Sequence, residues 1–401
     1  MTTPRSQKRR AAEPAAATLS PEALPAAWVR ETRTRLLRWY GRHKRDLPWR
    51  QSRDPYAIWI SETMLQQTRV ETVIPYWHRF LEHFPDVASL ADASQEDVYS
   101  AWTGLGYYSR ARNLQTAARQ IMDEHDGALP KTVDELRRLQ GIGPYTAGAV
   151  ASIAFDRPAA IVDGNVVRVL SRLRGLREDV GQKAIMDRLW SWSESLVSAG
   201  RRAGDFNQAM MELGATVCLP RAPLCLSCPL RNHCDAERSG DAESLPIKAS
   251  RKKPKVVSAV AVWIERRGKV LVVQRPETGL MANLWELPGG EIDVKKPQEA
   301  DTRAAVRAAT GLAIGQLERA GQVTHLFTHR KLTLHVHVAR RIEGRVHLGD
   351  LQAFRWLAPH ALADLPQAGP MRKALALLGR GPEESPRARM RTGQAQMQAK
   401  K

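Results

Sequence analysis

The chain has 401 residues and a formal net charge of +19, and 43% of its residues are hydrophobic. This length provides for two or three domains, and the positive charge favours a polyanionic partner, with nucleic acid ahead of an anionic membrane surface. No stretch approaches the roughly 18 apolar residues of a membrane span, and the first twenty residues lack the apolar core of a signal peptide.

The two ends of the chain are expected to be disordered basic tails, over residues 1–21 and 376–401. The first tail is rich in Ala, Arg and Lys, and an organellar transit peptide is an alternative interpretation that Glu13 disfavours. Because no export signal or membrane span is found, we expect a cytoplasmic, nucleoid-associated protein in a reducing compartment that makes no contact with membranes.

Residues 22–235 are expected to form an all-α domain. Apolar residues recur at helical spacing over 27–40, 58–80, 98–122 and 183–196, with short turns containing Pro or Gly between these stretches. Within this domain, the sequence LQGIGPYTAG at 139–148 has the form of a helix–hairpin–helix. We expect Gly141 and Gly143 to adopt positive φ angles and to expose backbone N–H groups to a phosphate, although a simple helix C-cap would also contain glycine.

The four cysteines of the chain fall close together, with the spacing C-x6-C-x2-C-x5-C. They are Cys218, Cys225, Cys228 and Cys234. Two disulfides are disfavoured in an intracellular chain of this size. A four-thiolate zinc site usually has two close pairs of cysteines, whereas this loop has only one, and an iron–sulfur cluster also takes four thiolates.

A change in composition marks a second domain. Residues 236–255 are polar and charged and are expected to be a linker, followed by a smaller α+β domain over residues 256–375. Strands are expected at 256–264 and 270–273. A further, half-buried strand is expected where apolar residues from Leu332 to Val338 alternate with Thr333, His335 and His337.

Several motifs carry a resemblance to known families. The hairpin, an aspartate (Asp163) twenty residues after Gly143, and the cysteine loop together resemble the helix–hairpin–helix glycosylases of the endonuclease III superfamily. The segments WISETMLQQT (59–68), GLGYYSRAR (104–112) and FNQAMMELG (206–214) closely resemble adenine DNA glycosylases of the MutY type. This resemblance runs from about residue 47 to 234 and implies a [4Fe-4S] cluster on the four cysteines.

The resemblance assigns two carboxylates to the chemistry. Cleavage of an adenine N-glycosidic bond needs an acid for the leaving base and a negative charge for the sugar cation. The family residue that matches Glu62 protonates adenine, and an apolar neighbourhood is expected to raise the pKa of this carboxyl. The residue that matches Asp163 stabilises the cation. Taken singly, Glu62 would be interpreted as a surface helix residue and Asp163 as a helix N-cap.

Further site residues follow from the same resemblance. Tyr145 stands where strand-cleaving relatives have a Schiff-base lysine, which predicts an enzyme without strand cleavage. Asn165 matches a residue that hydrogen-bonds the reacting sugar region. Gln67 and Tyr107 match the residues that wedge into DNA beside the lesion. The residues that match those around the flipped adenine are Arg45, Leu47, Trp49 and Gln208. Core packing is an alternative role for Trp49 and Tyr107.

The second domain resembles a Nudix frame without its acids. The sequence LWELPGGE (284–291) looks like the start of a Nudix box that closes at Gly311. The first acid position of the box would then be Lys296, its Arg-Glu pair Ala304 and Ala305, and its later Glu pair Ala308 and Ala309, so that every metal-binding carboxylate is absent. Such a domain is expected to bind rather than hydrolyse, because Mg²⁺ needs carboxylate ligands. In the resembling family a loop of this domain senses 8-oxoguanine opposite the adenine. The matching residues here are Phe327, Thr328 and His329, with Thr in place of Ser.

The sequence therefore predicts a monomeric, monofunctional adenine DNA glycosylase for base-excision repair. Its expected substrate is double-stranded DNA that contains 8-oxoguanine:A or G:A mispairs. Three alternatives remain: a bifunctional glycosylase and lyase for oxidised pyrimidines, a non-catalytic DNA-binding or redox-sensing protein, and a nucleotide-pyrophosphate hydrolase.

Overall fold

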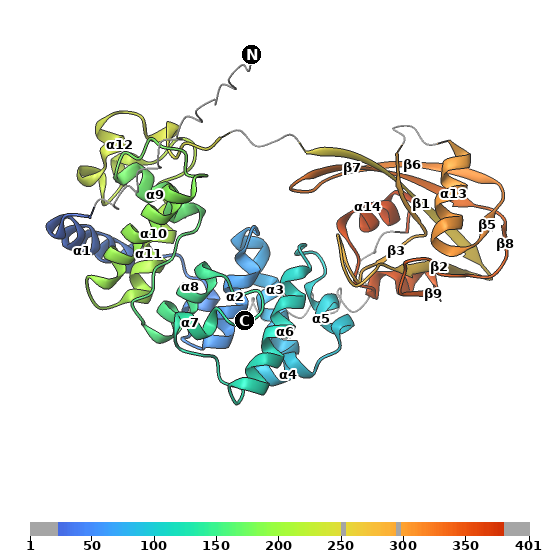
Figure 1. The fold of residues 1–401 in the computed structure, drawn as a ribbon, viewed down its shortest axis with the longest axis horizontal. Helices are drawn as coiled ribbons and strands as arrows, with labels where there is room; N and C mark the ends of the chain where they lie inside the picture. The colour runs from blue at the N-terminus through green and yellow to red at the C-terminus, as the bar shows by residue number, and fades with distance from the viewer. Residues whose placement is uncertain (1–22, 250–253, 294–297, 381–401) are drawn as a thin grey trace, which may run out of the picture. The chain divides into compact units, whose positions relative to one another are not determined.

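The computed structural model describes residues 23–249, 254–293 and 298–380 (Figure 1). The tail expected at 1–21 lies outside these residues, as do Lys296 and residues 381–401 of the tail expected at 376–401. The first residues of that second tail are not disordered, because 376 and 377 form the end of α14 (Gly369–Leu377). The chain splits into two compact units. The first comprises Met1–Arg45 and Ala151–Ala249, and the second comprises Asp46–Val150 and Ser250–Lys401. This division does not follow the boundary near residue 236, because the second unit combines helices of the N-terminal half with the C-terminal sheet.

The first unit is helical. It contains α1 (Ala26–His43), α9 (Gly164–Leu173), α10 (Lys183–Ser198), α11 (Ala203–Thr216) and the end of α8 (Pro144–Phe155). Leu36 of α1 and Leu189 of α10 are fully buried. The buried Arg33 of α1 donates to the carbonyl oxygens of Leu196 (2.6 Å) and Val197 (3.2 Å), so a cation satisfies the C-terminal end of α10.

The cysteine loop follows α11 and is built from short helical turns. These are η2 (Cys225–Ser227), η3 (Arg231–His233), α12 (Asp235–Arg238) and η4 (Ala242–Ser244). Ala236 and Leu245 are buried, and the Arg172 side chain donates to the carbonyl oxygen of Leu245 at 3.0 Å. The first part of the segment expected to be a linker, 236–255, is therefore folded against the first unit.

The second unit starts with short helices. They are η1 (Pro48–Arg50), α2 (Pro55–Leu65), α3 (Val70–His83), α4 (Val87–Asp92), α5 (Gln95–Trp102), α6 (Ser109–Glu124) and α7 (Val133–Leu136). The helical patterns over 58–80 and 98–122 are each interrupted. Gln67 (φ 57°) lies between α2 and α3, and Tyr107 (φ 50°) lies between α5 and α6. A right-handed helix cannot contain such left-handed residues, so each pattern forms two helices joined by a sharp turn.

The C-terminal part of the second unit contains a mixed sheet. Its strands are β1 (Lys255–Arg266), β2 (Lys269–Gln274), β3 (Trp285–Glu286), β4 (Gly289–Ile292), β6 (Leu317–Leu326), β7 (Arg330–Ala339) and β9 (Ala353–Leu357). The order is β3-β2-β1-β7-β6, with β4 paired to β1 and β9 to β2, and β1 runs parallel to β7. The short strands β5 (Ala313–Ile314) and β8 (Ile342–Glu343) pair separately.

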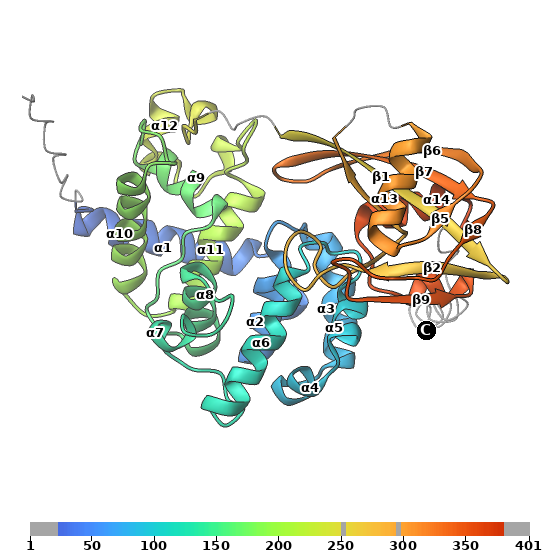
Figure 2. The same cartoon turned by 45° about the vertical axis from the view of Figure 1, so that its right-hand side comes forward.

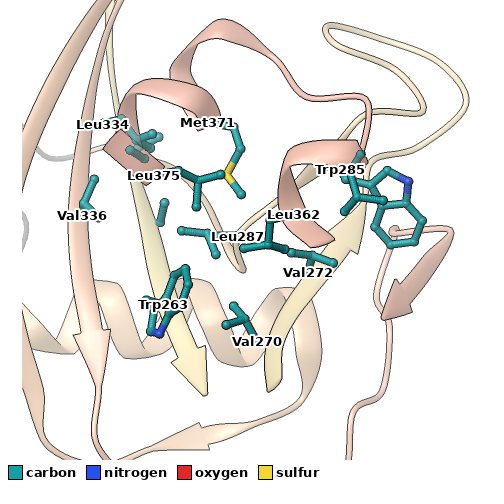
Figure 3. Close-up of a cluster of buried hydrophobic side chains, with 14 of the residues drawn as sticks. Trp263, Val270, Val272, Trp285, Leu287, Leu334, Val336, Leu362, Met371 and Leu375 are labelled. Carbon is teal, nitrogen blue, oxygen red and sulfur yellow. The ribbon is translucent and has the colours of Figure 1, made fainter. Parts of the chain in front are cut away.

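Helices pack against this sheet on both faces. On one face α14 (Gly369–Leu377) contributes Met371 and Leu375 to a core that includes Trp263 and Val272 (Figure 3). On the other face α13 (Glu299–Thr310) contacts β1 and β4 (Figure 2), and its Val306 is buried with side chains such as Ile264 in a second core.

The alternating strand expected over 332–338 is buried on both faces rather than half buried. His335 and His337 of β7 are only 5% and 7% exposed. The alternation places the imidazoles on the face opposite the leucines, and that face is buried as well. The α+β fold of the second domain is confirmed.

Candidate active site and DNA-facing surface

Glu62 is a buried carboxyl that accepts a hydrogen bond from Tyr145. Its helix, α2, starts at Asp54, whose carboxylate accepts from the backbone N–H groups of Tyr56 (3.1 Å) and Ala57 (3.2 Å). Glu62 is 5% exposed, which excludes the surface-helix alternative. The hydroxyl of Tyr145 donates to Glu62 Oε2 at 2.7 Å. The structure therefore brings together a carboxyl and a phenol that are 83 residues apart in sequence.

The helix–hairpin–helix turn holds Tyr145 at the start of α8. Gly141 has φ 78°, and a Cβ at this position would lie 2.5 Å from Cβ of Asn113, so only glycine fits. Gly143 is not among the residues with positive φ, and a Cβ there would meet open space. The expectation of positive φ at Gly143 is therefore wrong. Its carbonyl oxygen instead accepts the backbone N–H of Ala147 at 3.0 Å and starts the next helix.

Asp163 is the N-cap of α9 in the first unit. Its Oδ1 accepts from the Val166 backbone N–H at 2.7 Å, and its Oδ2 accepts from the Asn165 side-chain amide at 2.9 Å. Burial raises the pKa of this carboxyl, and the two hydrogen bonds oppose that shift because they favour the ionised form. The N-cap alternative is thus correct for the geometry. The N-cap bond uses Oδ1, and Oδ2 is held by the Asn165 side chain.

Arg168 connects this carboxylate to the cysteine loop. Its guanidinium donates to Asn165 Oδ1 (2.8 Å), to the carbonyl oxygen of Gly214 (2.7 Å) and to the carbonyl oxygen of Cys218 (2.7 Å). Asn165 is therefore fixed from both ends, by Asp163 and by Arg168. Sequence reasoning missed Arg168, because nothing distinguishes it from the other basic residues of the chain.

The residues expected around adenine have different environments. Arg45 forms a two-pronged ion pair with Glu212, with Nε–Oε1 and Nη2–Oε2 distances of 2.9 Å, and Glu212 is fully buried. Leu47 and Trp49 are buried. The ring centroids of Trp49 and Trp77 lie 6.0 Å apart in a T-shaped arrangement, so Trp49 does pack in a core. Gln208 lies half-buried on α11. Glu212 was missed as a functional candidate although it lies in the family-like segment 206–214.

Tyr107 and the loop after β6 lie side by side. Tyr107 is 48% exposed, which argues against core packing as its role, and its hydroxyl is 2.8 Å from Thr328 Oγ1. Thr328 and His329 are exposed at the β6–β7 turn, which is closed by a backbone hydrogen bond from Phe327 to Arg330 at 2.8 Å. These residues line a cavity of about 570 Å³ within the second unit.

The four cysteines are free thiols that all line a single cavity. Arg172, 2% exposed, donates to Cys218 Sγ at 3.3 Å. Burial raises the pKa of the Cys228 thiol to about 12. The His, Cys, Asp and Glu side chains of the described residues form no group drawn close enough to be a preformed metal site. Protonated thiols do not attract one another, and a cationic centre would draw them together as thiolates, so the all-sulfur donor set fits an iron–sulfur or zinc centre.

The Nudix-like frame has its glycines but lacks carboxylates at the metal positions. Gly290, which opens the box, pairs with Val260 in the sheet, and a Cβ there would meet open space, while Gly311 (φ 71°) ends α13. The alanines at 304, 305, 308 and 309 lie within α13. Asp301, in the first turn of this helix, is engaged in a capping box with Gln298.

Comparisons with known proteins agree with this arrangement. Residues 60–195 match the family model of the HhH-GPD superfamily of base excision DNA repair proteins, and residues 259–377 match the NUDIX domain. The chain is 40% identical to the adenine DNA glycosylase of Mus musculus over 362 residues, which is 76% of this chain and 70% of that protein. It is 39% identical to the adenine DNA glycosylase of Homo sapiens over 388 residues, which is 82% of this chain and 71% of that protein.

The chain belongs to the adenine DNA glycosylase family. The resemblance inferred from the hairpin, the cysteine loop and the segments 59–68, 104–112 and 206–214 is thereby confirmed, as is the two-part fold of helices followed by a Nudix-like domain. None of the described helices is long and apolar enough to cross a membrane. Glu62 and Tyr145 lie in the second unit, and Asp163 and Asn165 lie in the first.

Proposed function

We propose that this protein is a monofunctional glycosylase that removes adenine opposite 8-oxoguanine or guanine in duplex DNA. The observation that carries the proposal is the buried Glu62 carboxyl held by the Tyr145 hydroxyl in a chain of the adenine DNA glycosylase family. The enzyme is proposed to act as a monomer. A substrate in genomic DNA implies action at the nucleoid, within the cytoplasm.

Glu62 is proposed as the acid that protonates the leaving adenine. Removal of water from around a carboxyl disfavours its charged form, and Glu62 is 5% exposed. The 2.7 Å hydrogen bond from the Tyr145 hydroxyl to Oε2 fixes the orientation of the carboxyl. Proton transfer to the base neutralises the charge that develops as the glycosidic bond breaks.

Asp163 is proposed to face the cation that develops on the sugar. Burial raises the pKa of this carboxyl, and the hydrogen bonds from Val166 and Asn165 oppose that shift because they favour the ionised form. The two carboxyls thus take the roles that glycoside hydrolysis requires, one as a proton donor and one as an anion opposite an oxocarbenium-like centre.

Tyr145 supports the absence of strand cleavage. A lyase of this superfamily needs an amine that forms a Schiff base with the opened sugar. A phenol cannot do so, and the Tyr145 hydroxyl is already engaged with Glu62. Water is therefore the proposed final nucleophile, and the product is an intact strand with an abasic site.

The cysteines Cys218, Cys225, Cys228 and Cys234 are proposed to hold a [4Fe-4S] cluster. The cluster would cross-link the loop and supply structural rigidity rather than redox chemistry at the sugar. Arg168 transmits that rigidity, since it binds the carbonyl oxygen of Cys218 and the side chain of Asn165. The loop also carries the exposed Arg221 and Arg231, which suit contacts with DNA phosphates.

The Nudix-like domain is proposed to sense the base opposite adenine. The loop of Phe327, Thr328 and His329 offers an exposed hydroxyl and imidazole beside Tyr107. The alanines of α13 argue against pyrophosphate hydrolysis, because hard cations need carboxylate oxygens.

The proposed specificity is tested with three duplexes that differ only in the base opposite adenine. Wild-type protein should release free adenine fastest opposite 8-oxoguanine, more slowly opposite guanine and slowest opposite cytosine. The strand should remain intact until alkali is added. Trapping of a covalent DNA complex by borohydride would establish a lyase instead, and tight lesion binding without base release would establish a non-catalytic binder.

A further inference from the structure

Arg110 is a buried cation whose contacts connect two surface turns. It lies in the first turn of α6 and is 8% exposed. Its Nη1 donates to the carbonyl oxygens of Thr63 (2.9 Å), Met64 (2.8 Å) and Gln66 (2.7 Å), at the C-terminal end of α2. A cation at this end satisfies carbonyl groups that have no partner within the helix.

The other branch of the same guanidinium binds the turn between α5 and α6. Arg110 Nη2 donates to the carbonyl oxygens of Leu105 (3.3 Å) and Gly106 (3.1 Å), and to Thr68 Oγ1 (3.3 Å) just after α2. The guanidinium carbon also lies 5.6 Å from the centroid of the Tyr107 ring. One planar side chain therefore fixes the backbone of both turns, the one after α2 and the one between α5 and α6.

Each of these turns presents a strained, exposed side chain. Gln67 (φ 57°) and Tyr107 (φ 50°) are both exposed residues in the left-handed region. This conformation is strained for a residue that has a Cβ, and it persists only where surrounding contacts enforce it. The contacts of Arg110 supply that enforcement, since they bind the carbonyl oxygens of Gln66 and Gly106 immediately before the two residues.

We propose that Arg110 is a positioning residue that fixes Gln67 and Tyr107 as a pair, so that the two side chains enter DNA together where adenine is extruded. This inference rests on the proposed function. It also ties extrusion to chemistry, because α2 carries Glu62 and ends at the carbonyl groups that Arg110 holds. Lysine would keep the charge but lacks the planar fork that reaches both sets of acceptors.

The test measures extrusion separately from base release. A duplex carries 2-aminopurine, a fluorescent adenine analogue quenched by stacking, at the target position opposite 8-oxoguanine. Saturating wild-type protein should raise its fluorescence. Arg110→Lys should bind the duplex but lose most of that rise, and single-turnover release of adenine from the matching duplex should fall by about 100-fold, the cost of a misplaced reacting group.

Arg119→Lys is the matched control. Arg119 also lies on α6 and donates to a backbone carbonyl, that of Ala91 at 3.0 Å, but it is exposed and does not contact either turn. This variant should behave as wild type. An equal loss of fluorescence in both variants, or a full rise with Arg110→Lys, would overturn the inference.

Two further variants distinguish positioning of Gln67 and Tyr107 by Arg110 from a merely structural role of Arg110. In a Gln67→Ala/Tyr107→Ala background, the additional Arg110→Lys change should have no further effect on extrusion, whereas a general loss of folding would lower every signal. Thr68→Val removes a single acceptor and should give a smaller fall in fluorescence at an unchanged melting temperature. Additive losses in the first background, or no fall with Thr68→Val, would contradict the proposal. The fluorescence readout decides the inference even if wild type releases no adenine, which would refute the proposed function alone.

Discussion

At the scale of single residues, the catalytic candidates are held by side chains that are themselves fixed. Tyr145 orients Glu62, and Asn165 orients Asp163 under the control of Arg168. Each of these hydrogen bonds favours one orientation of its carboxyl, because any other orientation would break the bond. The pH dependence of the reaction should report these bonds.

Removal of the Asn165 amide should shift the acid limb of the pH–rate profile to higher pH. In the proposed mechanism the ionised form of Asp163 is the active one, so activity should be lost as pH falls through its pKa, which burial already raises above the ordinary value. The Asn165 hydrogen bond lowers that pKa, and Asn165→Ala should raise it further. Single-turnover rates measured across pH would show the shift, and an unmoved acid limb would contradict the assignment of Asp163.

Sequence reasoning found the residues that carry motifs and missed those that support them. Glu62, Asp163 and Tyr145 stand in recognisable segments. Arg168 lies outside these segments. Arg110 lies in the segment 104–112 but was not singled out, because the chain has 61 lysines and arginines and a buried one has no distinct pattern. Only the fold shows which cations bind backbone carbonyls in the interior, since that requires distant turns to be brought together.

At the scale of elements, turns between helices place the functional side chains. The helical pattern over 58–80 gave no sign that Gln67 splits it, because this residue has none of the freedom of glycine. The glycines before Tyr107 indicated a turn, but not that Tyr107 itself would be left-handed. The alternation in β7 likewise gave no sign that both faces of the sheet are covered, because burial depends on helices that are remote in sequence. The local sequence pattern therefore predicted the type of most elements, but not where these helices end or that both faces of β7 are buried.

The two glycines of the hairpin should differ in their tolerance of alanine. Gly141→Ala should lower the free energy of unfolding by at least about 1–2 kcal/mol, because its φ is 78° and the new Cβ would collide with Asn113. Gly143→Ala should change that free energy by less than about 0.5 kcal/mol, because the site is open and needs no positive φ. Denaturant unfolding of both variants checks this, and equal effects would show that the hairpin geometry is not as described.

At the scale of the whole molecule, the chain combines a helical glycosylase part with a Nudix-like domain, and its cysteine loop should determine the integrity of the first unit. Cys228→Ser should lose the visible absorbance of an iron–sulfur cluster and lower the melting temperature, because one of four thiolate ligands is gone. Ser227→Ala, at an exposed neighbouring position, is the control. Metal analysis of wild type that finds zinc in place of iron and sulfide would contradict the cluster assignment.

The family motifs allowed the order of the domains to be predicted, but not the compact units. The sequence-based boundary near residue 236 follows composition, whereas the units follow contacts, and residues 236–249 fold against the first unit through Ala236 and Leu245. A polar composition indicates a surface segment, and it does not reveal the few buried apolar residues that anchor it.

The most direct test of the account is release of free adenine from a duplex with adenine opposite 8-oxoguanine, by wild type, Glu62→Gln and Glu71→Gln. Glu71 is an exposed carboxylate on α3 and serves as the matched control. Wild type and Glu71→Gln should release adenine at equal rates. Glu62→Gln should bind the duplex and release none, because an amide cannot supply the proton. Undiminished release by Glu62→Gln would contradict the central claim.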